Sequence, residues 1–296
     1  MKINWIINGI LVIVGFLLLN CNPKVEIPAY IYVENVSFSA KNEQGTSSAK
    51  IPDIWVAVNG KSIGVYQLPA LFPVIAEGGT QLWIEAGIKL DGLSQQRPKY
   101  PFYSMYKENI NLTKGKIDTI VPEFRYLDSL KFPLIEDFES AGLKFSSVPN
   151  SAELKKTNDN NLIFHNGNEP NTYSGIIELP TADDISFFEI KTTSALWLNS
   201  YSATYCFVEL NFCFTENVEI GMYCYYKSSS PRQIALTNII GKENNTEWNK
   251  IYVNLTKEMG DATAAGMTHF EVYMKSGIPK GKTARYLFDN IKLIHQ

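Results

Sequence analysis

The stretch IWVAVNGKSIGVYQL, Ile54–Leu68, places two apolar runs on either side of Asn59-Gly60. An Asn-Gly pair tolerates the positive φ that both central residues of a tight turn require, so it favours a β-hairpin. Two later segments also have a glycine turn between apolar runs: Val74–Leu90, around Glu77-Gly78-Gly79, and Glu108–Phe124, around Lys114-Gly115. No long helical period separates them. The sequence therefore predicts a small antiparallel β-sandwich over residues 28–124.

The composition is that of a folded, β-rich chain. Of the 296 residues, 45% are apolar and 12% are aromatic, which favours strands and binding faces over helices. At roughly 100–200 residues per domain, this length predicts two domains. The chain has 27 basic and 30 acidic residues and no basic block, so we expect no nucleic-acid partner.

The second half of the chain is a further series of strand-like runs. It follows a polar connector, of which residues 125–131 are the predicted linker. The runs are SGIIELP, ISFFEIKTT, YCFVELNFCF, IGMYCYYKS, RQIALTNII, WNKIYVNLT and HFEVYMKS. Their number and spacing predict a second, larger all-β domain over residues 132–296.

Both ends of this second domain resemble the galactose-binding-like jelly rolls of carbohydrate-binding modules. The opening segment PLIEDFES has an acidic-aromatic motif, and the closing segment ARYLFDNIKLIHQ has an aromatic residue before Asp-Asn-Ile. The matching residues are Glu136, Asp137, Phe138 and Glu139, then Phe288, Asp289, Asn290 and Ile291. The resemblance implies an all-β protein in which a β jelly roll follows the small sandwich.

The first domain and the whole chain carry two further resemblances. The stretch from Ile54 to Gly87 resembles PEGA-type and related transthyretin-like domains of bacterial surface proteins, which are structural or adhesive. The ordered segments GTSS, LPALFPV, AGIKLDG, YPFY and EDFE are similar to those of predicted lipoproteins of the Bacteroidota. That likeness implies an outer-membrane location.

The first residues predict export and lipidation. Trp5–Leu19 is nearly all apolar but too short for the ~30 Å hydrocarbon core, so residues 1–20 are interpreted as a signal peptide. The end of this segment, LLNC, resembles a bacterial lipobox, which implies that Cys21 is acylated and that residues 21–27 are a short tether to outer-membrane lipid. An ordinary cleavage site with an incidental cysteine is the alternative. The residues after Cys21 do not indicate which side of the membrane the protein faces.

The resemblance to jelly rolls also implies a structural calcium site. In such domains the first and last strands often lie side by side and bind Ca²⁺ through carboxylates, which are the hard oxygen ligands that this ion prefers. The candidate ligands are Glu136, Asp137, Glu139 and Asp289. The alternative is that these acids are solvated strand ends or turn residues. No other cofactor is expected.

The sequence predicts binding rather than catalysis. It has none of the GxSxG, HExxH, Walker or GxGxxG motifs, so no enzyme activity is expected. A sugar site needs exposed aromatic side chains, and the candidates are Trp197, Tyr201, Tyr223 and Tyr225. The alternative for each of them is a place in the core.

A second candidate surface lies in the first domain. The segment Asp91–Tyr106 contains two prolines and is a poor strand. It also carries the residue types that anchor interfaces: Arg97, Tyr100, Phe102, Tyr103 and Tyr106. We therefore expect a lipid-anchored binding or scaffold protein that docks onto an outer-membrane protein through these rings. The alternatives are that the loop folds back over its own sheet, and that the protein is a carbohydrate-binding surface lipoprotein.

The mature chain has three further cysteines, Cys206, Cys213 and Cys224. Cys206 and Cys213 are seven residues apart and face opposite sides of a continuous strand, so they are not expected to bond each other. A bridge from either of them to Cys224 stays open.

Overall fold

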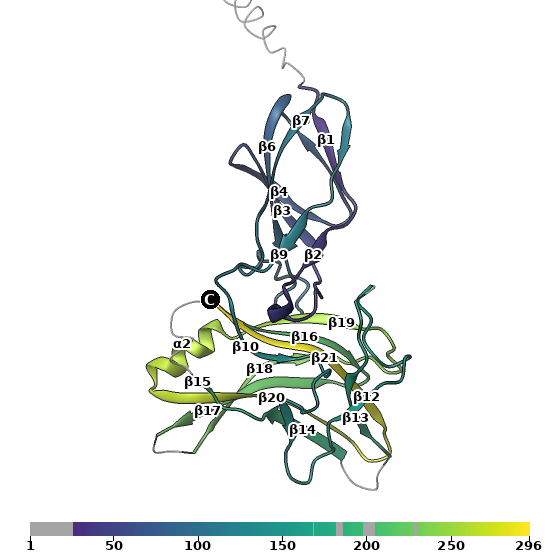
Figure 1. The fold of residues 1–296 in the computed structure, drawn as a ribbon, viewed down its shortest axis with the longest axis vertical. Helices are drawn as coiled ribbons and strands as arrows, with labels where there is room; N and C mark the ends of the chain where they lie inside the picture. The colour runs from purple at the N-terminus through teal and green to yellow at the C-terminus, as the bar shows by residue number, and fades with distance from the viewer. Residues whose placement is uncertain (1–25, 168, 182–185, 198–204, 228–229) are drawn as a thin grey trace, which may run out of the picture.

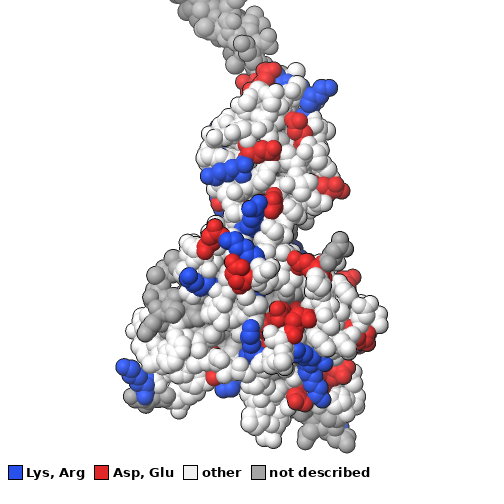
Figure 2. Space-filling view, viewed as in Figure 1, with Lys and Arg blue, Asp and Glu red and all other residues white. Residues whose placement is uncertain are grey.

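The computed structural model describes residues 26–296 except 168, 182–185, 198–204 and 228–229. It is an all-β protein in which a slender first domain stands on a broader second domain (Figure 1). On the face shown in Figure 2, basic and acidic side chains are interspersed over both domains. No helix among the described residues is long and apolar enough to cross a membrane.

The first domain contains three small sheets. They have the strand orders β4-β3-β6-β7, β5-β1-β8 and β2-β9. The elements are β1 (Ala29–Val33), β2 (Ser37–Ser39), the 3-10 turn η1 (Asn42–Gln44), β3 (Asp53–Val58), β4 (Lys61–Gln67), β5 (Ala70–Val74), β6 (Gly78–Gly87), β7 (Tyr106–Leu112), β8 (Ile117–Thr119) and β9 (Glu123–Arg125). Their inward side chains form one apolar cluster, as expected for a sandwich.

The Asn-Gly hairpin is confirmed, but the two later hairpins are not formed. Asn59 and Gly60 both have positive φ, 49° and 79°, and they join the antiparallel strands β3 and β4. By contrast, β5 pairs with β1 instead of β6, and β8 runs parallel to β1 instead of pairing with β7. The glycines there let the chain turn, but the chain crosses between sheets because the apolar faces of both sheets must be buried.

The second domain is a two-sheet jelly roll. The junction sheet, which faces the first domain, has the order β12-β13-β21-β16-β19, with β10 paired to β21. The outer sheet, on the far side, has the order β11-β14-β20-β17-β18, with β15 paired to β20 (Figure 1). The elements are β10 (Lys131–Glu136), β11 (Phe145–Ser147), β12 (Lys155–Thr157), β13 (Ser174–Leu179), β14 (Ser186–Thr192), β15 (Leu196–Trp197), β16 (Cys206–Phe214), β17 (Val218–Tyr226), β18 (Arg232–Ile239), β19 (Asn249–Asn254), α2 (Thr256–Ala264), β20 (Met267–Ile278) and β21 (Ala284–His295).

The first and last strands of this domain pair side by side, as the resemblance implied. Glu136 of β10 lies opposite Ile291 of β21 in an antiparallel ladder. The helix α2 was not predicted, because its few apolar residues give only a weak helical period. It packs Met259 and Ala262 into the core.

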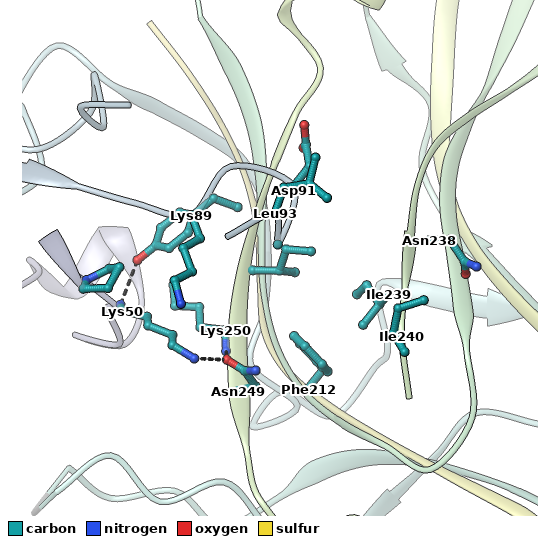
Figure 3. A pocket seen from close by; sticks show the side chains of 14 residues that line it. Lys50, Lys89, Asp91, Leu93, Phe212, Asn238, Ile239, Ile240, Asn249 and Lys250 are labelled. Carbon is teal, nitrogen blue, oxygen red and sulfur yellow. Dashed lines mark hydrogen bonds between the residues drawn. The ribbon is translucent and has the colours of Figure 1, made fainter. Parts of the chain in front are cut away.

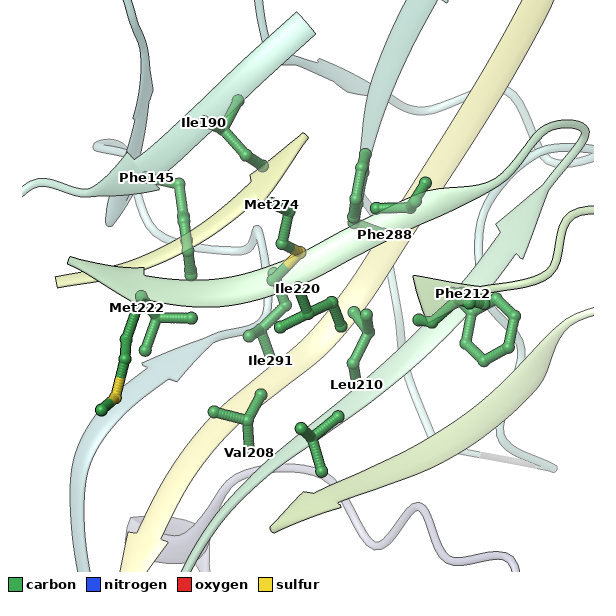
Figure 4. Close-up of a cluster of buried hydrophobic side chains, with 14 of the residues drawn as sticks. Phe145, Ile190, Val208, Leu210, Phe212, Ile220, Met222, Met274, Phe288 and Ile291 are labelled. Atoms are coloured by element: carbon green, nitrogen blue, oxygen red, sulfur yellow. The ribbon is translucent and has the colours of Figure 1, made fainter. Parts of the chain in front are cut away.

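The core of the second domain lies between its two sheets. Figure 4 shows Phe145, Ile190 and Met222 of the outer sheet meeting side chains of the junction sheet such as Val208 and Phe288. All nine residues of β16 are buried, because one of its faces lines this core and the other is covered by the first domain.

The three cysteines are free thiols, so neither bridge that the sequence left open is formed. Cys206 and Cys224 lie within the core of the second domain, and burial raises the pKa of Cys206 to about 12. Cys213 is also buried and bonds the backbone carbonyl of Asn245. These thiols are therefore core residues with little thiolate character.

Candidate functional site

The outward face of the outer sheet, which we call the outer face, carries a group of polar and aromatic side chains. Strand alternation produces it, because every second residue of β14, β17 and β20 faces the core and the residues between them face out. The outward residues are Phe187, Glu189 and Lys191 on β14, Glu219, Gly221, Tyr223 and Tyr225 on β17, and His269, Glu271, Tyr273 and Lys275 on β20.

A row of three rings runs across one end of the outer face. Tyr225 lies opposite His269 in the ladder, and their rings stack with centroids 4.4 Å apart and planes within 5°. Trp197 of β15 continues the row, with its ring 5.5 Å from that of His269. Trp197 is 59% exposed, so the row presents an open aromatic surface to solvent.

A second aromatic pair lies in the middle of the outer face. The rings of Tyr223 and Tyr273 are 4.8 Å apart. Tyr273 lies flat over Gly221, where a Cβ would come within 2.3 Å of its ring. A glycine is therefore required at this position if the Tyr273 ring is to lie against the sheet.

Carboxylates and lysines hold these rings in place. Tyr223 donates a 2.6 Å hydrogen bond to Oε1 of Glu189, and Tyr273 donates one of 2.6 Å to Oε1 of Glu219. A third carboxylate, Glu271, accepts from Tyr225 and from Lys191. The hydrogen bond to Glu271 raises the pKa of Lys191, so this lysine stays cationic at neutral pH.

The other end of the outer face contains a shallow hollow of about 360 Å³. Its apolar wall is Phe187, which is 42% exposed, and its polar lining includes Glu189, Glu219 and Lys275. The ion pair between Lys275 and Glu219, with a 3.2 Å separation, lies in this hollow. The outer face therefore joins an aromatic row, a polar middle and a polar hollow on one sheet.

The structure brings together three of the four predicted sugar-binding residues. Trp197, Tyr223 and Tyr225 all lie on the outer face rather than in the core, and Tyr201 lies outside the described residues. Sequence reasoning missed His269, Tyr273 and the three carboxylates. The alternation in HFEVYMKSG, which puts His, Glu, Tyr and Lys on one side of a strand, is the signal that would have indicated them.

The predicted calcium ligands bond mainly to backbone N–H groups. Glu136 is buried and accepts from the amide of Phe138 at 2.9 Å, and Glu139 accepts from Thr172 and Tyr173. Glu136 also accepts from the amide of Lys144, and Asp137 accepts from the amide of Glu139. Asp289 accepts from the side chains of Asn171 and Ser174 and from the amide of Asn290. Within the described residues, no three His, Cys, Asp or Glu side chains are grouped to hold a metal. The calcium site stays a prediction.

The predicted docking loop is corrected, because most of its rings are buried inside the protein. Tyr100, Phe102 and Tyr103 are at most 7% exposed. The rings of Tyr100 and Phe102 pack edge-on against Phe207 of β16, with centroids 5.2 and 5.4 Å away. The outer side of the junction sheet carries the apolar side chains Phe207, Tyr252 and Ile294, and these rings help to cover them. The expectation that they are exposed for an outside partner is therefore wrong.

The other two candidate residues of that loop, Arg97 and Tyr106, bond to partners within the first domain. Arg97 forms an ion pair with the buried carboxylate of Asp53 at 2.8 Å. Tyr106 is half-buried and donates to Glu108 on the same strand. The sequence suggested either that this loop docks onto an outside partner or that it folds back over its own sheet. Neither interpretation is complete, because the loop covers the junction sheet of the second domain as well as the apolar cluster of the first domain.

No protein-family model and no curated protein matches the chain. Solved structures to which this chain is similar include carbohydrate-binding modules. One, described as carbohydrate-binding modules from the β-sandwich superfamily, has a TM-score of 0.42 at 14% identity, covering 92% of this chain and 99% of that chain. The C-terminal family 22 module of Clostridium thermocellum Xyn10B has a TM-score of 0.38 at 13% identity, covering 56% and 96%. TmCBM61, in complex with β-1,4-galactotriose, has a TM-score of 0.31 at 16% identity, covering 51% and 87%.

Proposed function

We propose that the second domain binds a carbohydrate through the outer face. The observation that carries this proposal is the exposed row of Trp197, His269 and Tyr225 beside fixed carboxylates and lysines. A sugar ring has an apolar C–H face, which packs on an aromatic ring, and hydroxyls that both donate and accept hydrogen bonds. The outer face offers both kinds of contact on one rigid sheet.

The side chains of this face are already ordered by their own contacts. Each tyrosine hydroxyl donates to a neighbouring carboxylate: Tyr223 to Glu189, Tyr225 to Glu271 and Tyr273 to Glu219. A ligand would therefore not need to freeze these rotamers, and the entropy cost of binding is reduced. Each carboxylate keeps lone pairs that can accept from sugar hydroxyls.

The same contacts favour binding without catalysis. Glycoside hydrolysis needs one carboxyl group that is protonated and a second that attacks or activates water. On the outer face, Glu219 and Glu271 each form an ion pair with a lysine. Against the opposing effect of burial, the hydrogen bonds from Tyr273 and Lys275 lower the pKa of Glu219, which favours its ionised form. We therefore propose a binding module rather than a glycosidase.

We also propose that the protein is anchored by lipid, but we no longer propose that the aromatic loop docks onto a partner. Acylation of Cys21 would hold the protein on outer-membrane lipid, and the side of the membrane is left open. Docking onto an outer-membrane protein was expected from the aromatic loop, but its central rings are covered by the second domain. Carbohydrate binding by the second domain is therefore the function that the geometry supports best, and the lipid anchor is proposed from the sequence alone.

The test is a glycan array followed by titration with the soluble oligosaccharide that binds. Trp197→Ala and Tyr225→Ala should each weaken binding roughly ten-fold or more, because each removes an aromatic contact. Tyr205→Ala is the matched control, since Tyr205 is an exposed ring away from the outer face. Equal losses in all three variants, or an array without any bound glycan, would contradict the proposal.

A further inference from the structure

A second pocket, of about 280 Å³, lies where the two domains meet, and its lining reaches Asn238 at the edge of the outer-face hollow. The first domain contributes Lys50, Lys89 and Leu93, and the second contributes Phe212, Ile240 and Lys250. Figure 3 shows the lysines on one side of this junction pocket and the apolar side chains Phe212, Ile239 and Ile240 on the other. The pocket therefore has a basic wall and an apolar wall.

Two lysines of the basic wall lack a carboxylate partner. Lys50 donates to the neutral side-chain carbonyl of Asn249 (Figure 3). Lys89 forms no ion pair with any residue that the structure describes. Lys250 differs, because its Nζ lies 2.7 Å from Oε2 of Glu209 and its charge is neutralised there. The basic wall thus carries two positive charges that nothing nearby balances.

Asp91, the acidic residue that lines the pocket, does not neutralise the charges of Lys50 and Lys89. The carboxylate of Asp91 points away from the lysines in Figure 3. It accepts a 2.9 Å hydrogen bond from the backbone amide of Asn254. Burial, and then the charge of Lys89, lowers the pKa of Lys50, as expected for two cations that share one hollow. An anion between them would relieve this repulsion.

The apolar wall is open to solvent. Leu93 is 51% exposed and Ile240 is 72% exposed, and they come from different domains. Phe212 and Ile251 line the pocket between them. Large apolar side chains that face each other across a hollow gain stability when an apolar group fills the space.

We propose that the junction pocket binds a small organic anion with an apolar body, of the class of medium-chain carboxylates. The anionic head would lie between Lys50 and Lys89, and the body would lie against Leu93, Phe212 and Ile240. Because the lining comes from both domains, such a ligand binds only their docked arrangement and therefore stabilises it. The proposed ligand is distinct from the carbohydrate, although Asn238 lines both the junction pocket and the hollow of the outer face.

Three probes separate the contributions of head and body: hexanoate has both, acetate has only the head, and hexanol has only the body. In titrations of the whole protein, followed by calorimetry and by the melting temperature, hexanoate should bind at least ten-fold more tightly than either of the other two. Equal or weaker binding of hexanoate would overturn the proposal, and so would the absence of any binding.

Lys89→Met is the diagnostic variant, because Lys89 forms no ion pair within the described part of the chain whose loss would disturb the fold. It should weaken hexanoate binding roughly ten-fold or more, the scale of a hydrogen bond to a charged group, while Lys89→Arg should retain it. Lys61→Met, an exposed lysine on β4, is the matched control and should bind as the wild type does. If Lys89→Met binds hexanoate as well as Lys61→Met does, the carboxylate does not lie at this wall and the proposal fails.

Discussion

Tyr100 of the first domain donates a 2.8 Å hydrogen bond to Oε1 of Glu209, a fully buried residue of the second domain. Tyr126 donates to the other oxygen of the same carboxylate at 2.9 Å, and Lys250 forms an ion pair with it. A carboxylate is costly to bury unless it is paired and hydrogen-bonded. Glu209 therefore favours the one docking geometry in which both tyrosines reach it.

Tyr100→Phe should destabilise the whole protein. The phenylalanine ring keeps the packing against Phe207 but leaves Oε1 of Glu209 without its donor, at a cost of about 1–3 kcal/mol in the free energy of unfolding. Urea denaturation measures this difference. Tyr205→Phe, in which an exposed ring loses its hydroxyl, is the control and should change little. Equal stability of the two variants would show that the hydroxyl of Tyr100 contributes nothing to the junction.

Lys292 should make stability depend on pH on the alkaline side of neutrality. It is fully buried and donates 2.7 Å to the carbonyl of Thr46 across the junction. Burial, and then Lys250, lowers its pKa to about 7 from 10.5, against the opposing charges of Glu209, Glu169 and Asp137. The unfolded chain therefore keeps the proton on this lysine up to a higher pH than the folded chain does. The contribution of Lys292 to stability should therefore rise with pH between about 7 and 10.5. Buried Cys206, whose pKa is raised to about 12, contributes the opposite slope as the thiols of the unfolded chain ionise, so the effect of Lys292 is the difference in slope between the wild type and a variant without this lysine.

The measurement compares urea unfolding at several pH values from 7 to 9.5, below the range in which tyrosines of the unfolded chain ionise. Lys292→Met should flatten the rise in stability, because it removes the titrating group. Lys116→Met, an exposed lysine of the first domain, should keep the wild-type slope. An unchanged slope in Lys292→Met would mean that this lysine is not the group responsible.

The membrane anchor has a test of its own. Cys21→Ser removes the thiol that would carry the lipid, so the protein should move from the membrane fraction to the soluble fraction. Each methylene of an acyl chain buried in the bilayer contributes ~0.8 kcal/mol to membrane binding, so a protein without the acyl chains should no longer be held in the membrane. Cys213→Ser, at a cysteine within the folded domain, controls for loss of a thiol. Retention of Cys21→Ser in the membranes would rule out this anchor.

The calcium prediction is tested by chelation. If Glu136, Asp137, Glu139 and Asp289 hold a calcium ion, a chelator should lower the melting temperature of the protein, because an ion that binds only the folded state stabilises it. Asp289→Ala should abolish the difference between the calcium-loaded and chelated samples. An identical melting temperature with and without chelator in the wild type would mean that these carboxylates hold no calcium ion and have only their hydrogen-bond partners within the protein.

The sequence predicted those features that local chemistry determines. The Asn59-Gly60 turn is local, and so is the alternation that places Tyr223 and Tyr225 on one side of β17. Strand partners in the first domain depend on which sheet needs burial, so β5 and β8 could not be assigned from turn residues. The burial of Tyr100 was also non-local. Its one sequence signal was Phe207 of β16, an apolar side chain on the side of the strand that faces away from the core of the second domain.

Gly221 tests whether the outer face depends on the close approach of Tyr273. In Gly221→Ala the new Cβ would lie 2.3 Å from the Tyr273 ring and 2.4 Å from the carbonyl oxygen of Ile234, so the ring must leave the sheet. Overpacking of this kind costs about 1–3 kcal/mol. The displaced ring would also lose its hydrogen bond to Glu219 and its contact with Tyr223.

For Gly221→Ala we expect a lower free energy of unfolding in urea and weaker binding of the oligosaccharide that the glycan array identifies. Gly79→Ala, where no atom lies within 4 Å of the added Cβ, is the matched control. If both alanine variants unfold at the same urea concentration, Tyr273 does not require a glycine beneath it.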